Sequence, residues 1–322
     1  MKIINLTPEE WDQELAKIKF HTFFHTIDWL QLVQKNHLWL TLNLNKMEID
    51  QKEILFPYFQ YKKKIISLPF CEYGGPISNS SLSEEDVLEV LSEFEDYNIS
   101  IHPFSFQKSS KMSTFIINLN HKTKEDLLQS FRKTTRHSIR YSQQKEIEVT
   151  DILNEEELRK AYKIYLRSMQ RNAAFPMSFQ FIRELCNKKQ AKVWIALENK
   201  QIISMIVVLF HQKYAHYFKS GNLNNRKSYA NYALIWQAIQ YSLQNGYEYF
   251  DFGATEKGAP LEVFKSGWGT QQYDLPIFST IIRDNNQKKT FKNKILGIIW
   301  KHAPLLLIEN ISPYAKRWFM SK

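Results

Sequence analysis

Residues 249–269 read Tyr249-Phe-Asp-Phe-Gly-Ala-Thr-Glu-Lys-Gly-Ala-Pro-Leu-Glu-Val-Phe-Lys-Ser-Gly-Trp-Gly269. This stretch predicts a buried strand over 248–252 that ends in Gly253, followed by a loop. A short helix over 260–266 then delivers Phe264-Lys265. Ligands commonly bind where the strands of an α/β sheet end, so this segment is the first place where we expect chemistry.

Asp251 and Lys265 are the candidate catalytic residues of this stretch. A lysine held here can supply a fixed positive charge to the oxyanion that forms when a carbonyl is attacked. A purely structural interpretation is also open, in which Asp251 caps a turn and Lys265 is a solvated helix residue. The spacing alone does not choose between the two.

The rest of the chain predicts the same order of elements twice. Each half is expected to run strand, two helices, three strands, helix, strand. A long helix over 123–145 joins the halves, and one strand is expected over 271–282. The expected elements of the second half are strands over 148–152, 191–197, 202–210, 214–219 and 248–252, with helices over 155–171, 178–187 and 229–244.

This order resembles the fold of the Gcn5-related N-acetyltransferases. It implies an α+β protein with two tandem acetyltransferase-like domains, each a central mixed sheet flanked by helices. We expect the domains to cover residues 1–146 and 147–284, with the Lys265 site in the second. The tail, residues 285–322, is expected to pack back on the first domain.

Four segments, in the correct order, are similar to the FemAB-like branch of that superfamily. This branch contains the peptidoglycan interpeptide-bridge aminoacyltransferases and many related bacterial acyltransferases. The resemblance spans about residues 20–280. It rests on His25-Thr26 with Trp29-Leu30, on Phe56-Pro57 with Ser67–Phe70 and Tyr73–Pro76, on Phe131–Arg140, and on Phe250–Gly253 with Phe264-Lys265 and Gly267–Gly269.

The resemblance implies transfer of an acyl or aminoacyl group onto an amine, with an acceptor groove between the two domains. Lys265 matches the family lysine that is thought to stabilise the transition state. The donor is expected to be an acyl-coenzyme A or an aminoacyl-tRNA. The acceptor is expected to be an anionic small molecule or a lipid-linked precursor of the cell envelope.

The segment that would bind the donor departs from the pattern of coenzyme A-dependent relatives. They place a glycine-rich loop before the helix that follows the three strands, whereas residues 222–232 contain no glycine after Gly221. A helix N-terminus can still bind phosphate, assisted by Arg226, Lys227 and Ser228. Both donors therefore stay open.

The charge of the chain is concentrated in two patches. The 43 Lys and Arg exceed the 33 Asp and Glu by ten. Residues 132–145 carry five of these cations and no acid, and residues 285–322 carry eight against Glu309 alone. The rest of the chain is near neutral, so the excess favours a local contact with one anionic group rather than a uniformly basic surface.

Arg132, Arg136 and Arg140 recur every four residues and are therefore expected on one helix face. Their forked donors suit a phosphate of the acceptor or of a tRNA backbone. A solvated helix is the alternative.

Glu72, Tyr73, Tyr217 and Lys219 are further candidates for substrate binding. Glu72 and Tyr73 lie in the loop that relatives place near the groove, where Glu72 could act as a base for the acceptor amine. Tyr217 and Lys219 end a predicted strand. A structural role is the alternative for all four residues.

Several classes of protein are excluded. Cys71 and Cys186 are too few for a disulfide framework, and the nine histidines show no metal-ligand pattern. The first residues lack the apolar core of a signal peptide, and no apolar stretch reaches the length of a bilayer-spanning helix. We expect a cytoplasmic protein without a metal.

The tail mixes apolar residues with lysines, which fits either a packed helix or a basic amphipathic helix on the inner face of the membrane. A second function stays open beside acyl transfer. The same fold could be a non-catalytic binder of nucleic acid or of an anionic membrane surface.

Overall fold

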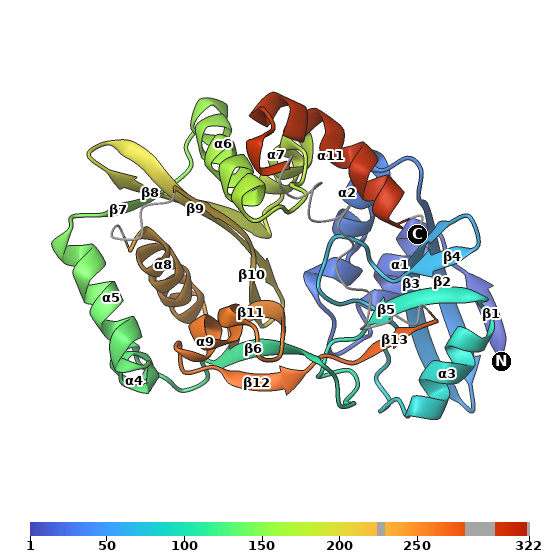
Figure 1. Cartoon of the computed structure of the whole chain (residues 1–322). Helices are drawn as coiled ribbons and strands as arrows, with labels where there is room; N and C mark the ends of the chain where they lie inside the picture. Colours follow the sequence, from blue (N-terminus) through green and yellow to red (C-terminus); the bar gives the residue numbers. More distant parts are fainter. Residues whose placement is uncertain (224–228, 281–299, 321–322) are drawn as a thin grey trace. The chain divides into compact units, whose positions relative to one another are not determined.

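The computed structural model describes residues 1–223, 229–280 and 300–320, which form two compact units (Figure 1). Unit 1 contains residues 1–114, 254–262 and 272–283, and unit 2 contains residues 115–253, 263–271 and 284–322. The first division thus falls at residue 114, before the expected 146. The reason is that Phe131 and Ile139 are buried in one cluster with Leu234 of unit 2.

Unit 1 is built on a sheet with the strand order β1-β2-β3-β4-β5-β13 in the described part of the chain. The pairs are antiparallel except β4–β5, which is parallel. The strands are β1 (Lys2–Asn5), β2 (Thr41–Ile49), β3 (Lys52–Tyr61), β4 (Lys64–Ile66), β5 (Asp96–Ser100) and β13 (Ile277–Ser279). The helices are α1 (Pro8–Leu15), η1 (Phe23–His25), α2 (Ile27–Asn36) and α3 (Glu84–Ser92).

The helices of unit 1 begin where the sequence supplies capping side chains. Thr7 and Glu10 form a capping box at α1, and Ser83 and Asp86 form another at α3, so donors at both helix starts are satisfied. Trp11 on α1 is fully buried. These local signals are the reason that both helices were predictable.

Unit 2 contains most of a second sheet, whose order is β12-β6-β11-β10-β9-β8-β7 in the described chain. The strands are β6 (Met112–Asn118), β7 (Glu148–Asp151), β8 (Ala191–Glu198), β9 (Gln201–His211), β10 (Tyr214–Asn222), β11 (Tyr249–Glu256) and β12 (Gln271–Asp274). The helices are α4 (Lys124–Ser130), α5 (Lys133–Gln144), α6 (Glu155–Arg171), α7 (Phe179–Cys186), α8 (Ala230–Gln244), α9 (Pro260–Ser266) and α11 (Leu305–Met320). The predicted α+β class and the order of elements are confirmed.

The strands β9, β10 and β11 position the site. β10 pairs antiparallel with β9, and the register shifts between Tyr217 and Lys219. β10 pairs parallel with β11 from Tyr214↔Tyr249 to His216↔Asp251. Both strands continue beyond these pairs, β10 to Asn222 and β11 to Glu256.

Two elements differ from the expectation. The helix expected over 123–145 is broken into α4 and α5, because Phe131 has extended backbone angles and Arg132 donates its N–H to Gly267 O at 2.9 Å. The strand expected over 271–282 is broken into β12 and β13. Pro276 lies at the break, where it lacks the N–H of a regular strand.

The described part of the tail belongs to unit 2, not to the N-terminal half as expected. Gln170 Nε2 of α6 donates to Ala303 O at 2.7 Å, and the Trp300 indole N–H donates to Ala174 O at 3.2 Å. Helix α11 then packs on α6 through the buried side chains of Ile308 and Ser312. Of the described tail, Ile308 and Ser312 are therefore buried within unit 2.

Candidate active site

Asp251 fixes the backbone of β11. Its side chain is fully buried, and Oδ1 accepts a 2.7 Å hydrogen bond from the N–H of Gly253. Gly253 has a φ of 72°, in the left-handed region that disfavours residues with a side chain. The carboxylate thus holds an irregular point of the strand in a defined geometry.

Lys265 meets the same point from helix α9. Its side chain is only 4% exposed, although Leu261 and Val263 of the same helix face solvent. Nζ donates to Gly253 O at 2.8 Å and lies 6.0 Å from the centre of the Phe115 ring. The solvated interpretation of Lys265 is therefore wrong, and the structure joins Asp251 and Lys265 through the two backbone groups of Gly253.

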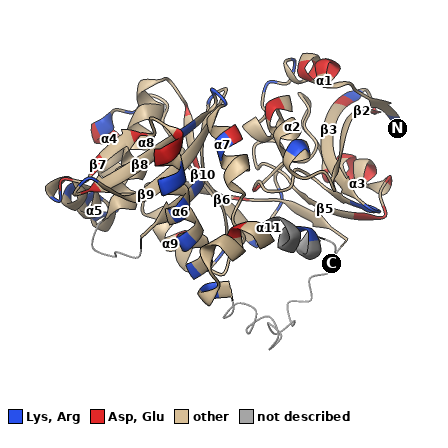
Figure 2. Ribbon diagram, turned by 90° about the horizontal axis from the view of Figure 1, so that it is seen from above, with Lys and Arg blue, Asp and Glu red and all other residues tan. Residues whose placement is uncertain are grey.

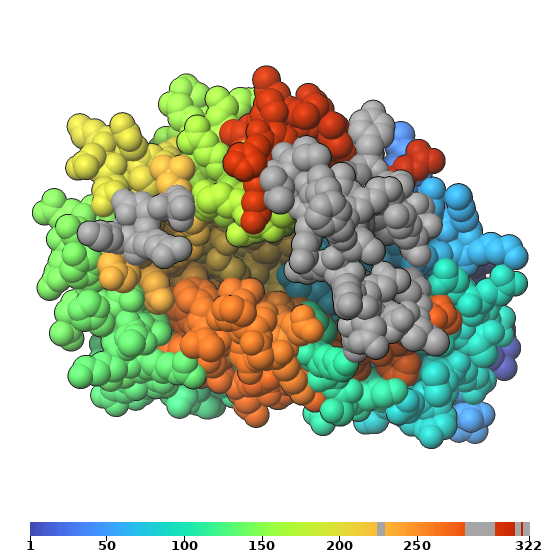
Figure 3. Space-filling view, viewed as in Figure 1, coloured from blue at the N-terminus to red at the C-terminus, as the bar shows by residue number. Residues whose placement is uncertain are grey.

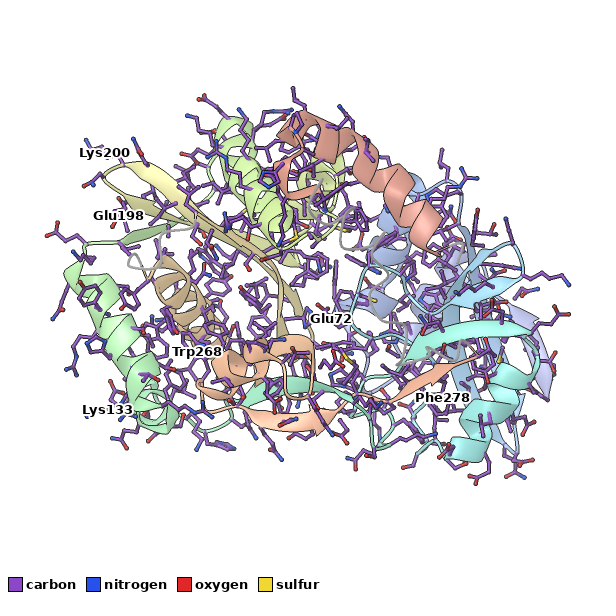
Figure 4. The ribbon with its side chains drawn as sticks, viewed as in Figure 1. Glu72, Lys133, Glu198, Lys200, Trp268 and Phe278 are labelled. Atoms are coloured by element: carbon purple, nitrogen blue, oxygen red, sulfur yellow. The ribbon has the colours of Figure 1, made fainter. Side chains whose placement is uncertain are left out.

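The Gly-Trp-Gly segment, whose Trp268 is labelled in Figure 4, directly follows the helix that carries Lys265. Trp268 is fully buried and lies among the rings of Phe131, Tyr232 and Phe252. A Cβ added at Gly267 would lie 2.8 Å from Thr135 Oγ1. The close approach of α5 explains this glycine, and the buried indole fixes where α9 ends.

His216 is a site residue that the sequence analysis missed. It is 5% exposed on β10, directly opposite Asp251 in the parallel register. Its Nδ1 lies 3.6 Å from Asp251 Oδ2. No motif surrounds His216 in the sequence, and only the register between β10 and β11 would have brought it to Asp251.

The arrangement favours the stabilisation of negative charge. The side chain of Lys265 is nearly removed from water, and the Coulomb interaction of a charged lysine is stronger where the effective dielectric constant is low. Its position is set in advance by Gly253 and by the packing of α9, so little reorganisation is needed when charge develops.

Tyr217 and Lys219 lie on either side of the register shift in β10. The Tyr217 ring packs 6.1 Å from the ring of Phe252, and burial raises the pKa of Tyr217 to about 12. Its hydroxyl therefore stays protonated at neutral pH. Lys219 Nζ lies 4.0 Å from the centre of the Phe218 ring.

Arg132, Arg136 and Arg140 differ in their hydrogen-bond partners and in their exposure. Arg132 caps α5, and its guanidinium donates to Val263 O at 3.3 Å. The Arg136 guanidinium donates to carbonyls at the end of α4, including Gln129 O at 3.2 Å. Arg140 is exposed. Arg136 thus closes the break between α4 and α5, whereas Arg132 ties the start of α5 to α9.

Glu72 and Tyr73 belong to unit 1, whereas Asp251 and Lys265 belong to unit 2. Tyr73 is 2% exposed and packs edge-on against the rings of Phe24 and His102. It is a core residue of its unit. Glu72 is half-buried beside it in the chain.

The expected donor residues Arg226, Lys227 and Ser228 lie outside the described residues. The neighbouring backbone is held by Ser204, whose Oγ lies 2.9 Å from Gly221 O and 2.6 Å from Asn231 Oδ1. This contact joins the end of β10 to the first turn of α8. The start of α8 therefore has a fixed position relative to the sheet.

Within residues 1–223, 229–280 and 300–320, no three His, Cys, Asp or Glu side chains are grouped so that they could hold a metal ion. No helix in this part of the chain is both long and apolar enough to cross a bilayer.

Residues 129–266 match the family model of the acetyltransferase (GNAT) domain. The matched segment contains Asp251, Gly253 and Lys265, and it begins at the end of α4. No curated protein matches the chain in a sequence search.

Solved structures extend the likeness of the fold to nearly the whole chain. FemX has a TM-score of 0.63 at 12% identity, covering 94% of this chain and all of FemX. The C-terminal domain of a protein assigned as a lysylphosphatidylglycerol synthetase from Agrobacterium fabrum has a TM-score of 0.57 at 11% identity, covering 86% of this chain and 93% of that one. A tandem GNAT protein of the clavulanic acid pathway has a TM-score of 0.50 at 9% identity, covering 86% and 97%. The expected tandem acetyltransferase-like fold is confirmed.

Proposed function

We propose that this protein is an acyl- or aminoacyltransferase that modifies an amine of a cell-envelope or nucleotide-sugar-type acceptor in the cytoplasm. The observation that carries the proposal is the buried ammonium of Lys265, held at 2.8 Å by Gly253 O within the segment that matches the GNAT model. The resemblance of the motifs to FemAB-like enzymes supports the class of acceptor. The class of acceptor is also supported by the fold that the chain shares with FemX and with the protein assigned as a lysylphosphatidylglycerol synthetase.

The reaction needs no covalent enzyme intermediate. The lone pair of the acceptor amine forms a C–N bond to the donor carbonyl, and the carbonyl electrons move to its oxygen. Lys265 stabilises this oxyanion. As the oxyanion collapses, the bond to the donor thiol or ribose hydroxyl breaks, that group takes a proton, and the amine loses one.

Asp251 acts in this proposal as a positioning residue rather than as a base. Its carboxylate is fully buried and is committed to the N–H of Gly253, whose carbonyl in turn receives Lys265. Its effect on the reaction therefore passes through the backbone. His216 supports the carboxylate from β10.

The remaining site residues are assigned to substrate binding in this proposal. Arg132 and Arg140 are exposed and can bind an anionic part of the acceptor or donor, and Arg136 keeps part of its guanidinium for this. Tyr217 and Lys219 of β10 are assigned to the donor and Glu72 to the acceptor, whereas Tyr73 supports the loop of Glu72 from the core of unit 1. None of these roles is needed for the Lys265 chemistry to operate.

The donor is either an acyl-coenzyme A or an aminoacyl-tRNA, and both present phosphate to the start of α8 beside Arg226, Lys227 and Ser228. A GNAT domain favours a coenzyme A thioester, whereas the FemAB-like motifs favour a charged tRNA. A thermal-shift comparison of acetyl-coenzyme A with charged tRNA separates them, because a ligand of the folded state alone raises the melting temperature.

The proposal is tested by Lys265→Met, assayed for transfer with the donor that raises the melting temperature. We expect kcat to fall about 100-fold or more, because one oxyanion donor is removed. Lys257→Met is the matched control, since Lys257 is exposed in the preceding loop. Unimpaired turnover in a folded Lys265→Met protein would exclude the assigned role.

The alternative function, a non-catalytic binder of an anionic partner, is favoured only by the two basic patches. It predicts no transfer with either donor. It also predicts nucleic-acid affinity that falls steeply with salt, since phosphate binding releases counterions. Turnover that depends on Lys265 rules this alternative out.

A further inference from the structure

The first two turns of helix α11, residues 305–312, bury one side and leave a second apolar side in solvent. Ile308 and Ser312 are buried against α6, whereas Leu306, Leu307 and Ile311 are 74%, 47% and 41% exposed. At 100° per residue these three side chains lie within one face of the helix. Exposed apolar residues that occur singly need no explanation, but three neighbours on one helix do.

The basic part of α6 packs beside the start of α11. Gln170 Nε2 donates to Ala303 O at 2.7 Å, so the C-terminal turns of α6 meet the segment that leads into α11. Lys163, Arg167 and Gln170 follow one another at helical spacing and therefore share a side of α6. Lys163 and Arg167 are both exposed.

The acids of α6 are confined to its first turn, at Glu155–Glu157, so the remainder of the helix is basic. Figure 2 shows this separation of acidic and basic bands along α6. Figure 3 shows α6 and α11 side by side on one face of unit 2.

We propose that this α6–α11 surface, defined by Lys163, Arg167, Leu306, Leu307 and Ile311, docks the protein on an anionic lipid bilayer. Apolar side chains of an interfacial helix enter the boundary between headgroups and acyl chains, and nearby cations bind lipid phosphates. The positive charge of this surface favours an anionic bilayer over a second copy of the chain. A symmetric second copy would bring the same cations of both chains together, whereas anionic lipid neutralises them.

The experiment is sedimentation of the full chain with vesicles of phosphatidylcholine alone or mixed with phosphatidylglycerol. We expect binding to the anionic vesicles that weakens with salt, and at least about tenfold weaker binding to the neutral ones. Lys163→Gln with Arg167→Gln should weaken anionic binding about thirtyfold, since each cation near the surface contributes about fivefold and the two factors multiply. Leu306→Asp with Leu307→Asp should abolish it.

Two controls make the outcome specific. Leu153→Asp changes a leucine that is 77% exposed elsewhere in unit 2, and Lys62→Gln with Lys63→Gln removes two cations from unit 1. Equal loss in the controls, or no binding by the wild type, would overturn the proposal. A change from dimer to monomer in Leu306→Asp with Leu307→Asp, seen by light scattering, would assign the surface to a second copy instead. The assay involves no transfer, so its result is separate from that of Lys265→Met.

Discussion

At the scale of single residues, the site depends on polar groups that are almost fully dehydrated. Asp251, His216 and Lys265 are each 5% exposed or less. Burial of such groups is costly unless they are paired, and here each one contacts a charged group or a backbone group of the site. This cost is typical of sites in which position and charge are required together.

A second buried histidine gives a prediction about pH. His21 of unit 1 is 5% exposed, and burial lowers its pKa from 6.5 to about 4. The unfolded state therefore binds more protons than the folded state between pH 6.5 and 4. The free energy of unfolding should fall by about 3 kcal/mol as the pH drops through this window. Denaturant titrations at pH 7, 5.5 and 4.5 measure the loss.

The control for this prediction is His21→Asn. Its amide can keep the hydrogen bond that His21 Nδ1 makes with Ile18 O at 3.2 Å, but it does not titrate. The dependence of stability on pH should be shallower in this variant by about one proton. Identical slopes in the two proteins would assign the dependence to other groups.

The residues of the site also differ in whether their roles could be predicted from the sequence. Asp251 and Lys265 stand in a recognisable motif, so the candidate pair could be predicted. The function of Gly253 as the link between them could not, because it depends on a positive φ and on the direction in which α9 returns. His216 and Ser204 act through strand pairing, which leaves no local signal.

At the scale of elements, strand β10 and helix α6 touch through backbone. A Cβ added at Gly221 would meet Tyr165 Cα and would lie 2.7 Å from Tyr165 N. Backbone atoms cannot rotate away as a side chain can. Gly221→Ala should therefore lower the free energy of unfolding by about 2–3 kcal/mol, as overpacking does, measured by thermal or denaturant unfolding.

Gly246→Ala is the matched comparison for this prediction. Gly246 has a φ of 75° and open space around the position of a Cβ, so only the backbone penalty of about 1 kcal/mol applies. An equal effect of the two substitutions would show that the contact with α6 is not tight.

Some helix boundaries could be predicted from the sequence and others could not. Capping boxes at Thr7 and Ser83 mark helix starts in the sequence itself. The break between α4 and α5 contains no Gly or Pro that would mark it in the sequence. It arises because Phe131 is buried and because the N–H of Arg132 donates to the carbonyl of Gly267, which is distant in the sequence. Tertiary contacts of this kind override a local helical pattern.

At the scale of the whole molecule, each unit is built from segments that are not contiguous in the sequence. Unit 1 needs β13, which pairs with β5, and the α4 and α5 helices that precede residue 146 pack in unit 2. A fragment of residues 1–146 should therefore lack cooperative unfolding, because it misses a strand and exposes Phe131 and Ile139. Denaturation and limited proteolysis of this fragment test the prediction, and a sharp transition would contradict it.

The pairing of β5 with β13 also sets a condition on synthesis. About 180 residues separate the two strands, which corresponds to about 10–35 s of translation at about 5–20 residues per second. During this time β13 has not yet been synthesised, so the edge of β5 that pairs with β13 has unpaired backbone donors and acceptors. Chaperones that hold extended chains are thus expected to assist the folding of this protein.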